Sequence, residues 1–191
     1  MKITTIISFF ISTILLSIHA VPHAQAQTYE IQLTSLPGDI GYTLPIHFGN
    51  QMFIVYFDTG SSELWIPEVG CIACGNKNKL NPTGLPINNR IIEIKYLNSR
   101  ISVYTAKADF TLSGIPVINQ VFGLATAVDQ SLQEFPVDGV MGFGRKLHSK
   151  FGAPSVFSTL ADSNNLRGQI FSVYLERTQD STSDQSRLTI G

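Results

Sequence analysis

The chain has 191 residues, of which 43% are hydrophobic and 14% charged, and its formal net charge is −1 at pH 7. This length suits one domain or a large part of a bigger protein, and it is sufficient to bury a sizeable core. The composition excludes a disordered chain, and the balanced charge argues against a nucleic acid or an anionic membrane as partner.

Residues 1–26 have the pattern of a secretory signal peptide. Lys2 supplies the positive charge, residues 6–18 form an apolar segment, and small residues follow at Ala20 and Ala26. We expect cleavage after Ala26, with Ala20 as the alternative. The apolar segment is short for a membrane-spanning helix. We therefore expect a secreted protein, or one in the lumen of the secretory pathway or vacuole, with a short segment at 27–37 before its main domain.

The two cysteines, Cys71 and Cys74, indicate a disulfide if the chain is secreted. The same Cys-x-x-Cys spacing occurs in redox-active proteins, but no helix pattern opens at the first cysteine and no βαβ pattern surrounds it. A zinc site would need more ligands. After the signal the chain offers only His47 and His148, which are far apart in sequence. We expect neither a metal nor a cofactor.

Short segments of alternating or continuous apolar residues dominate the chain, which predicts a mostly β fold with one or two short helices. Residues 70–89 and 126–133 are polar and predict loops, and 154–161 predicts a helix with Pro154 in its first turn. Strands are expected at residues 42–48, 51–57, 64–66, 91–96, 101–106, 108–112, 116–124, 137–144, 170–175 and 187–190.

One apolar strand, residues 53–57, runs directly into a carboxylate at Asp58 and then into a polar turn at 59–62. A carboxylate at the end of a buried strand is costly unless nearby donors satisfy it. Asp58 is therefore either held by such donors or used in chemistry. The plain alternative is a turn aspartate that bonds its own backbone.

The run Asp58-Thr59-Gly60-Ser61-Ser62, followed by Leu64-Trp65-Ile66-Pro67, resembles the N-terminal active-site motif of the pepsin-like aspartic proteases. Four further segments resemble segments of this family in the same order, and the loop around the cysteines is similar to that of fungal members. The resemblance covers about residues 38–191 and implies the N-terminal lobe of the bilobal pepsin-like fold. The four segments are residues 94–96, 120–125, 138–142 and 171–175.

The resemblance implies an aspartic endopeptidase that acts on proteins or peptides. Asp58 would be one of two carboxylates that share a proton and activate a water. Gly60 would let its backbone N–H approach the carboxylate, Ser61 would orient one carboxylate oxygen, and Thr59 would bond across to the other lobe. The other implied site residues are the flap Tyr96, whose hydroxyl is held by the Trp65 indole, and Val140 and Met141 near the substrate floor.

The chain departs from the family pattern in three respects. It contains one Asp-Thr-Gly and no second one, it has Leu97-Asn98-Ser99 where the flap usually has glycines, and it has no basic pro-segment between residues 26 and 38. The second carboxylate is therefore expected from a further lobe or from a second copy of the chain. The alternative function is a catalytically inactive, secreted lobe that binds peptides or proteins.

A serine hydrolase is a weaker alternative. Ser61 as nucleophile would need a general base, and neither His47 nor His148 lies in a recognisable hydrolase context.

Overall fold

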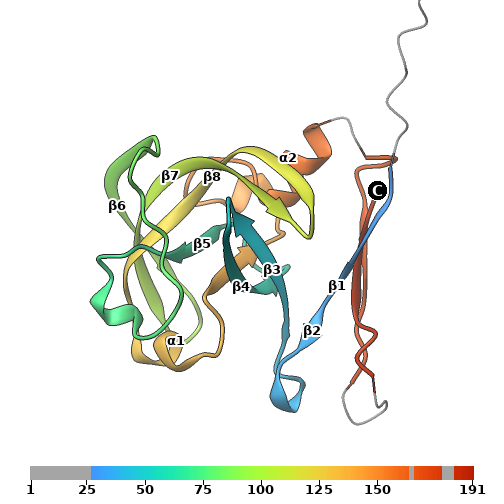
Figure 1. Ribbon diagram of the computed structural model, residues 1–191, viewed down its shortest axis with the longest axis horizontal. Helices are drawn as coiled ribbons and strands as arrows, with labels where there is room; N and C mark the ends of the chain where they lie inside the picture. The colour runs from blue at the N-terminus through green and yellow to red at the C-terminus, as the bar shows by residue number, and fades with distance from the viewer. Residues whose placement is uncertain (1–26, 164–165, 178–182) are drawn as a thin grey trace, which may run out of the picture.

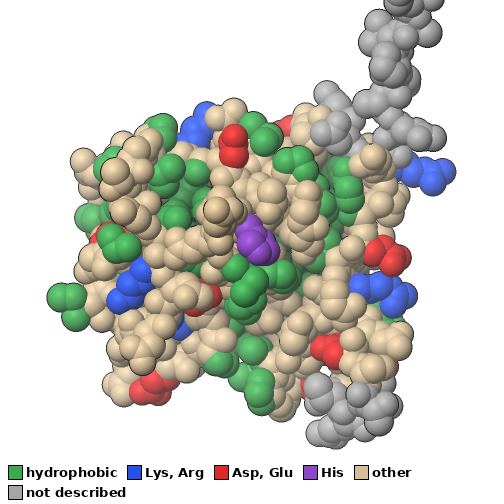
Figure 2. Space-filling model, viewed as in Figure 1, with side chains coloured by type: hydrophobic (Ala, Val, Ile, Leu, Met, Phe, Trp, Pro, Cys, Tyr) green, Lys and Arg blue, Asp and Glu red, His purple; other side chains and the backbone are tan. Residues whose placement is uncertain are grey.

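The computed structural model describes residues 27–163, 166–177 and 183–191. The expected signal peptide lies outside these ranges. Within them, no helix is long and apolar enough to cross a membrane. Figure 2 shows that acidic and basic side chains are scattered singly over the face in view, in keeping with the small net charge.

The main body is an eight-stranded sheet in the order β2-β3-β4-β9-β5-β8-β7-β6. An extra pairing of β3 with β7 brings distant parts of the sheet together, so that the sheet curls around its core (Figure 1). The strands are β2 (Thr34–Ser35), β3 (Tyr42–Phe48), β4 (Gln51–Asp58), β5 (Leu64–Pro67), β6 (Ile87–Lys95), β7 (Arg100–Leu112), β8 (Ile115–Val128) and β9 (Gly139–Gly142).

The centre of this sheet is the strand β9, which lies between β4 and β5. It runs parallel to β4, with Gly142 opposite Asp58, and antiparallel to β5. A Cβ on Gly139 would lie 2.0 Å from the carbonyl oxygen of Trp65, and one on Gly142 would lie 2.6 Å from the backbone nitrogen of Glu63. Glycine is therefore required at both positions for the chain segments to approach this closely.

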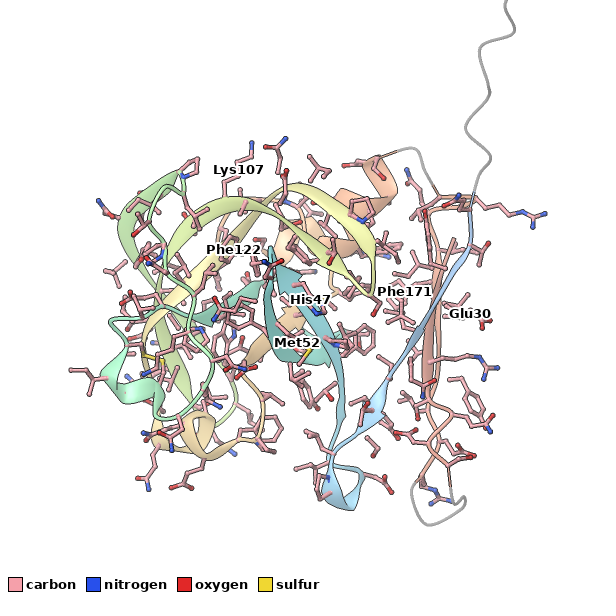
Figure 3. The ribbon with its side chains drawn as sticks, viewed as in Figure 1. Glu30, His47, Met52, Lys107, Phe122 and Phe171 are labelled. Carbon is pink, nitrogen blue, oxygen red and sulfur yellow. A yellow bond between two sulfur atoms is a disulfide. The ribbon has the colours of Figure 1, made fainter. Side chains whose placement is uncertain are left out.

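A separate three-stranded sheet, β1-β11-β10, stands at one side of the main body (Figure 1). Its inner face is apolar: Ile31 and Leu188 are buried, and Phe171 points toward the main body while Glu30 points away (Figure 3). This alternation buries one face of the sheet against the core. The strands are β1 (Tyr29–Gln32), β10 (Phe171–Tyr174) and β11 (Arg187–Ile190).

The core has two parts. The larger part fills the curled sheet and the space under β1 and β11, with Phe53 and Phe122 among its fully buried side chains. The smaller part surrounds Trp65 and includes the two cysteines. It lies beside the hairpin formed by β6 and β7, since Ile94 and Ile101 belong to it.

Most expected strands are present, and three expectations are corrected. Residues 101–106 and 108–112 form one continuous strand, β7, and β6 begins at Ile87 inside the expected loop. The expected loop 126–133 contains the end of β8 and a short helix, α1 (Gln130–Glu134).

The other helix, α2 (Val156–Asp162), begins later than expected. Ser155 is its N-cap, and the Oγ atom of Ser155 accepts a hydrogen bond from the Ser158 N–H at 3.3 Å. Pro154 therefore precedes the helix instead of lying in its first turn. Three 3₁₀ turns complete the elements: η1 (Pro37–Asp39), η2 (Ile72–Cys74) and η3 (Lys146–His148).

Candidate active site

Asp58 is the last residue of β4, and local donors fix its carboxylate. The Gly60 N–H donates to Oδ1 at 2.8 Å, and the Ser61 hydroxyl donates to Oδ2 at 2.5 Å. Both donors are those expected from the sequence. Asp58 is partly exposed, so the carboxylate is oriented and remains open to the solvent side.

The turn after Asp58 is also held by the chain that leaves β9. The Phe143 N–H donates to the Asp58 carbonyl at 2.7 Å, and the Gly144 N–H donates to the Ser61 carbonyl at 2.7 Å. These bonds join two segments more than eighty positions apart in the sequence. Thr59 lies exposed beside the carboxylate. Its expected bond to another lobe stays a prediction.

The hairpin of β6 and β7 carries Tyr96, which is bonded to Trp65. The indole Nε1–H of Trp65 donates to the Tyr96 hydroxyl oxygen at 2.8 Å. Burial raises the pKa of Tyr96 far above its ordinary value; the Trp65 bond opposes this rise, and the Glu63 and Asp58 carboxylates add to it. The Tyr96 hydroxyl therefore stays protonated. Its oxygen accepts the hydrogen bond from Trp65, so its own hydrogen remains free for donation to another acceptor.

The tip of this hairpin closes with a bond from the Tyr96 N–H to the Ser99 carbonyl at 2.7 Å. Among the described residues, the non-glycine residues with positive φ are Asp39, Ser113 and Asn119. Residues 97–99 therefore reach this turn without left-handed backbone, so the absence of glycine here causes no strain.

Two cavities are lined by both Asp58 and Tyr96. The first, of about 290 Å³, is mainly apolar, and Asp58 is the one charged residue among those that line it. The second, of about 390 Å³, is lined by the turn after Asp58, by the flap hairpin and by His148 and Lys150. The first is lined by Tyr56, Asp58, Tyr96, Asn98, Ser99, Ser131, Leu132, Phe135 and Val140.

The two residues expected at the substrate floor lie in different places. Val140 lines the first cavity, whereas Met141 is fully buried in the larger core and lies opposite Phe57 in the register of β9 with β4. This difference follows from the alternation of side chains along a strand.

The model of the eukaryotic aspartyl protease family matches residues 41–191. The chain belongs to the eukaryotic aspartyl protease family. Among relatives, it is 35% identical to pepsin A of Sus scrofa over 152 residues, which cover 76% of this chain and 38% of that protein. It is 36% identical to pepsin A of Canis lupus familiaris over 155 residues, covering 78% of the chain and 38% of the relative. It is 33% identical to cathepsin D of Clupea harengus over 153 residues, which cover 75% of this chain and 37% of that protein.

The chain thus spans about two fifths of the length of the curated relatives that it matches. Its mostly β fold is that of a pepsin-like lobe, which confirms the resemblance expected from the motif. Family membership and the geometry around Asp58 both favour aspartic-type peptidase chemistry over the alternatives considered from the sequence.

The serine-hydrolase alternative finds no support in the geometry of Ser61, because its hydroxyl donates to Asp58. His47 lies opposite Met52 at the start of β4, as Figure 3 also shows. Asp58 is six positions further along that strand, or roughly 20 Å at about 3.3 Å per residue. His47 therefore cannot serve as the base for Ser61.

The expected disulfide between Cys71 and Cys74 is confirmed, with an S–S distance of 2.01 Å. Both cysteines are buried in the smaller core beside Trp65, which does not favour thiol–disulfide exchange with other proteins. The part of the chain that the structure describes contains no cluster of three or more His, Cys, Asp or Glu residues suited to a metal ion.

Several residues that line the two cavities were not identified from the sequence, among them Tyr56, Phe135 and Glu63. Tyr56 and Phe135 line the first cavity, with their rings 5.5 Å apart in an edge-to-face arrangement, and Glu63 lies buried under the second. Glu63 is a charged residue directly before the apolar run 64–67, and this unusual position was a usable signal. Phe135 had no comparable signal.

Proposed function

We propose that this chain is the N-terminal lobe of an aspartic endopeptidase and supplies Asp58 as one of its two catalytic carboxylates. The observation that carries the proposal is the orientation of the Asp58 carboxylate by Gly60 and Ser61, at the junction of two cavities and near the Tyr96 hydroxyl. An aspartate with a purely structural role would not need a carboxylate that is both held by two donors and open to the cavities.

The chemistry requires a second carboxylate in contact with the first. Two such groups cannot both ionise readily, so they share one proton, as in the aspartic proteases generally. One then removes a proton from water while the other donates to the peptide carbonyl, and no covalent intermediate forms. The hydrogen bond from Ser61 to Oδ2 leaves Asp58 in one orientation for this exchange.

The second carboxylate would come from a further lobe or from a second copy of this chain. The exposed apolar side chains of Ile170, Tyr174 and Leu175, at and beside β10, support such a partner. Exposed apolar surface of this kind is typical of a surface that another protein part covers. A symmetric pair would bring two copies of Asp58 together.

We also propose that the substrates are proteins or peptides and that the chain enters the secretory pathway. Residues 1–26 have the pattern of a signal peptide. The Cys71–Cys74 disulfide supports an oxidising compartment, because disulfides persist there and are rare in the cytosol.

The test is cleavage of casein at acid pH by the purified protein, with and without pepstatin. We expect pepstatin-sensitive cleavage that falls by about a thousandfold or more in Asp58→Asn. Asp162→Asn, which makes the same chemical change at an exposed residue of α2, is the control and should retain full activity. Peptide binding without pepstatin-sensitive cleavage at any protein concentration would replace this proposal with the inactive binding lobe.

A further inference from the structure

We propose that the second cavity beside Asp58 selects an acidic side chain of the substrate. The inference rests on the proposed endopeptidase function and adds a substrate preference to it. It predicts a peptide with an apolar side chain on one side of the scissile bond and an aspartate or glutamate on the other.

The two cavities differ in charge. The first has one charged lining residue, Asp58. The second is lined by three basic residues, Lys95, His148 and Lys150, which come from the flap hairpin and from the loop after β9. A substrate that fills both cavities would therefore meet an apolar surface in the first and cationic side chains in the second.

The loop that carries His148 and Lys150 is tied to the turn after Asp58. The Ser62 hydroxyl donates to the Arg145 carbonyl at 2.8 Å, and the Lys150 backbone N–H donates to Glu63 Oε1. Glu63 is only 4% exposed, so this second bond is made inside the protein. The two bonds hold the loop at both ends of residues 145–150, and His148 and Lys150 of this loop line the cavity together with Asp58.

The carboxylates that line this cavity are already engaged by other donors. Glu63 accepts from the backbone N–H groups of Lys150 and Ser62, and Asp58 accepts from Gly60 and Ser61.

Among the basic residues, Lys95 lies 3.3 Å from Glu93, with side chains 74% and 43% exposed. Over the ranges that the structure describes, no ion pair involves Lys150 or His148. Lys150 is therefore the charge available to a substrate, with the His148 side chain in the lining of the same cavity.

An ionised glutamate side chain fits this arrangement. Exposed ion pairs are weak in water, but a bound peptide under the flap excludes water and strengthens the attraction. The glutamate must be ionised, which requires a pH above its ordinary pKa of about 4.3.

The test compares two fluorescent peptides that are identical except for Glu or Gln. Each has a Phe for the apolar cavity and a reduced, uncleavable central bond, and the Glu or Gln lies on the other side of that bond. Binding to the purified protein is measured by fluorescence anisotropy at about pH 5.5. We expect the Glu peptide to bind about fivefold more tightly, in line with a weak but partly desolvated ion pair.

The variants Lys150→Gln and His148→Gln should each reduce this ratio, and the double variant should bring it close to one. Lys107→Gln is the matched control: it removes the same charge from an exposed residue of β7 that does not line the cavity (Figure 3), and it should leave the ratio unchanged.

Equal binding of the two peptides, binding of neither, or a ratio that survives in the double variant would overturn the inference. Failure of the endopeptidase proposal is distinguishable. Casein cleavage without a preference for Glu overturns the inference alone, whereas Glu-dependent binding without cleavage contradicts only the endopeptidase activity.

Discussion

Trp65 contributes both packing and a hydrogen bond to the position of the flap. Its side chain is fully buried in the smaller core, and its indole N–H reaches the hydroxyl of Tyr96. Because the Trp65 indole N–H and the Tyr96 hydroxyl are hydrogen-bond partners, removal of either group leaves the other without this bond in a largely buried place.

The pair can be tested with a double-mutant cycle. We expect Trp65→Phe to lower the free energy of unfolding by about 2–3 kcal/mol, because it also leaves a void, and Tyr96→Phe by about 1–2 kcal/mol. The double variant should lose about 1 kcal/mol less than the sum. Urea unfolding followed by far-UV circular dichroism measures all three. Tyr174→Phe, at an exposed residue, is the control; strictly additive losses would mean that the bond does not form in solution.

Among single residues, the sequence predicted those parts of the site that lie close together in the chain. Residues 58–61 form one continuous motif, so their bonds follow from short-range geometry. The bond between Glu63 and Lys150 joins residues 87 positions apart. Nothing in either local sequence identifies the partner, because the fold alone brings the two segments together.

At the scale of elements, the close approach of β9 to its neighbours depends on its glycines. We expect Gly142→Ala to lower the free energy of unfolding by about 2–3 kcal/mol, since its Cβ would lie 2.6 Å from backbone atoms of Ser61 and Glu63. Thermal and urea unfolding would measure the loss. Gly168→Ala is the control, because there a Cβ would have its nearest neighbour at 3.6 Å. Similar stabilities of the two variants would show that β9 can move away.

The strands were predicted well because a two-residue alternation of apolar side chains is visible in the sequence. The division of β7 into two strands was wrong for a physical reason. Lys107, where the expected strand was divided, is an exposed position between Ala106 and Ala108, and the alternation that buries Ala106, Phe110 and Leu112 continues through it. The helix α1 was missed because it has only five residues, too few to show a helical period.

At the scale of the whole molecule, the sheet β1-β11-β10 joins the beginning of the described chain to its end. Tyr29 lies opposite Ile190, and Gln32 lies opposite Arg187. Residues 27–37 carry β1 and β2, which were not predicted, although Tyr29, Ile31 and Leu33 alternate with polar residues as in a strand. Pairing over such a distance in sequence is a property of the folded molecule.

Asp184 provides a pH-dependent link in this region. Its carboxylate accepts from the backbone N–H groups of Ser35 at 2.6 Å and Ser186 at 3.0 Å, which joins the end of β2 to the segment before β11. Its slight burial raises the pKa of Asp184, but the bonds from Ser186 and Ser35 outweigh this and hold the pKa below its ordinary value. The folded state therefore binds this proton less readily than the unfolded state. The resulting stability is present above the ordinary pKa and is lost as the pH falls through the lowered one.

We therefore expect Asp184→Asn to lower the free energy of unfolding by about 1 kcal/mol at pH 7, a modest value because water screens this partly exposed group. The difference from the parent should shrink toward zero as the pH falls through the lowered pKa, where Asp184 itself becomes neutral. Urea unfolding at pH 7, 4 and 2.5 measures it, with Asp162→Asn as the control for the same chemical change on α2. A difference that stays constant over this range would mean that the bonds do not depend on the charge. A difference that disappears would mean that the attachment of β2 to the three-stranded sheet weakens under the acid conditions in which the proposed activity is to be assayed.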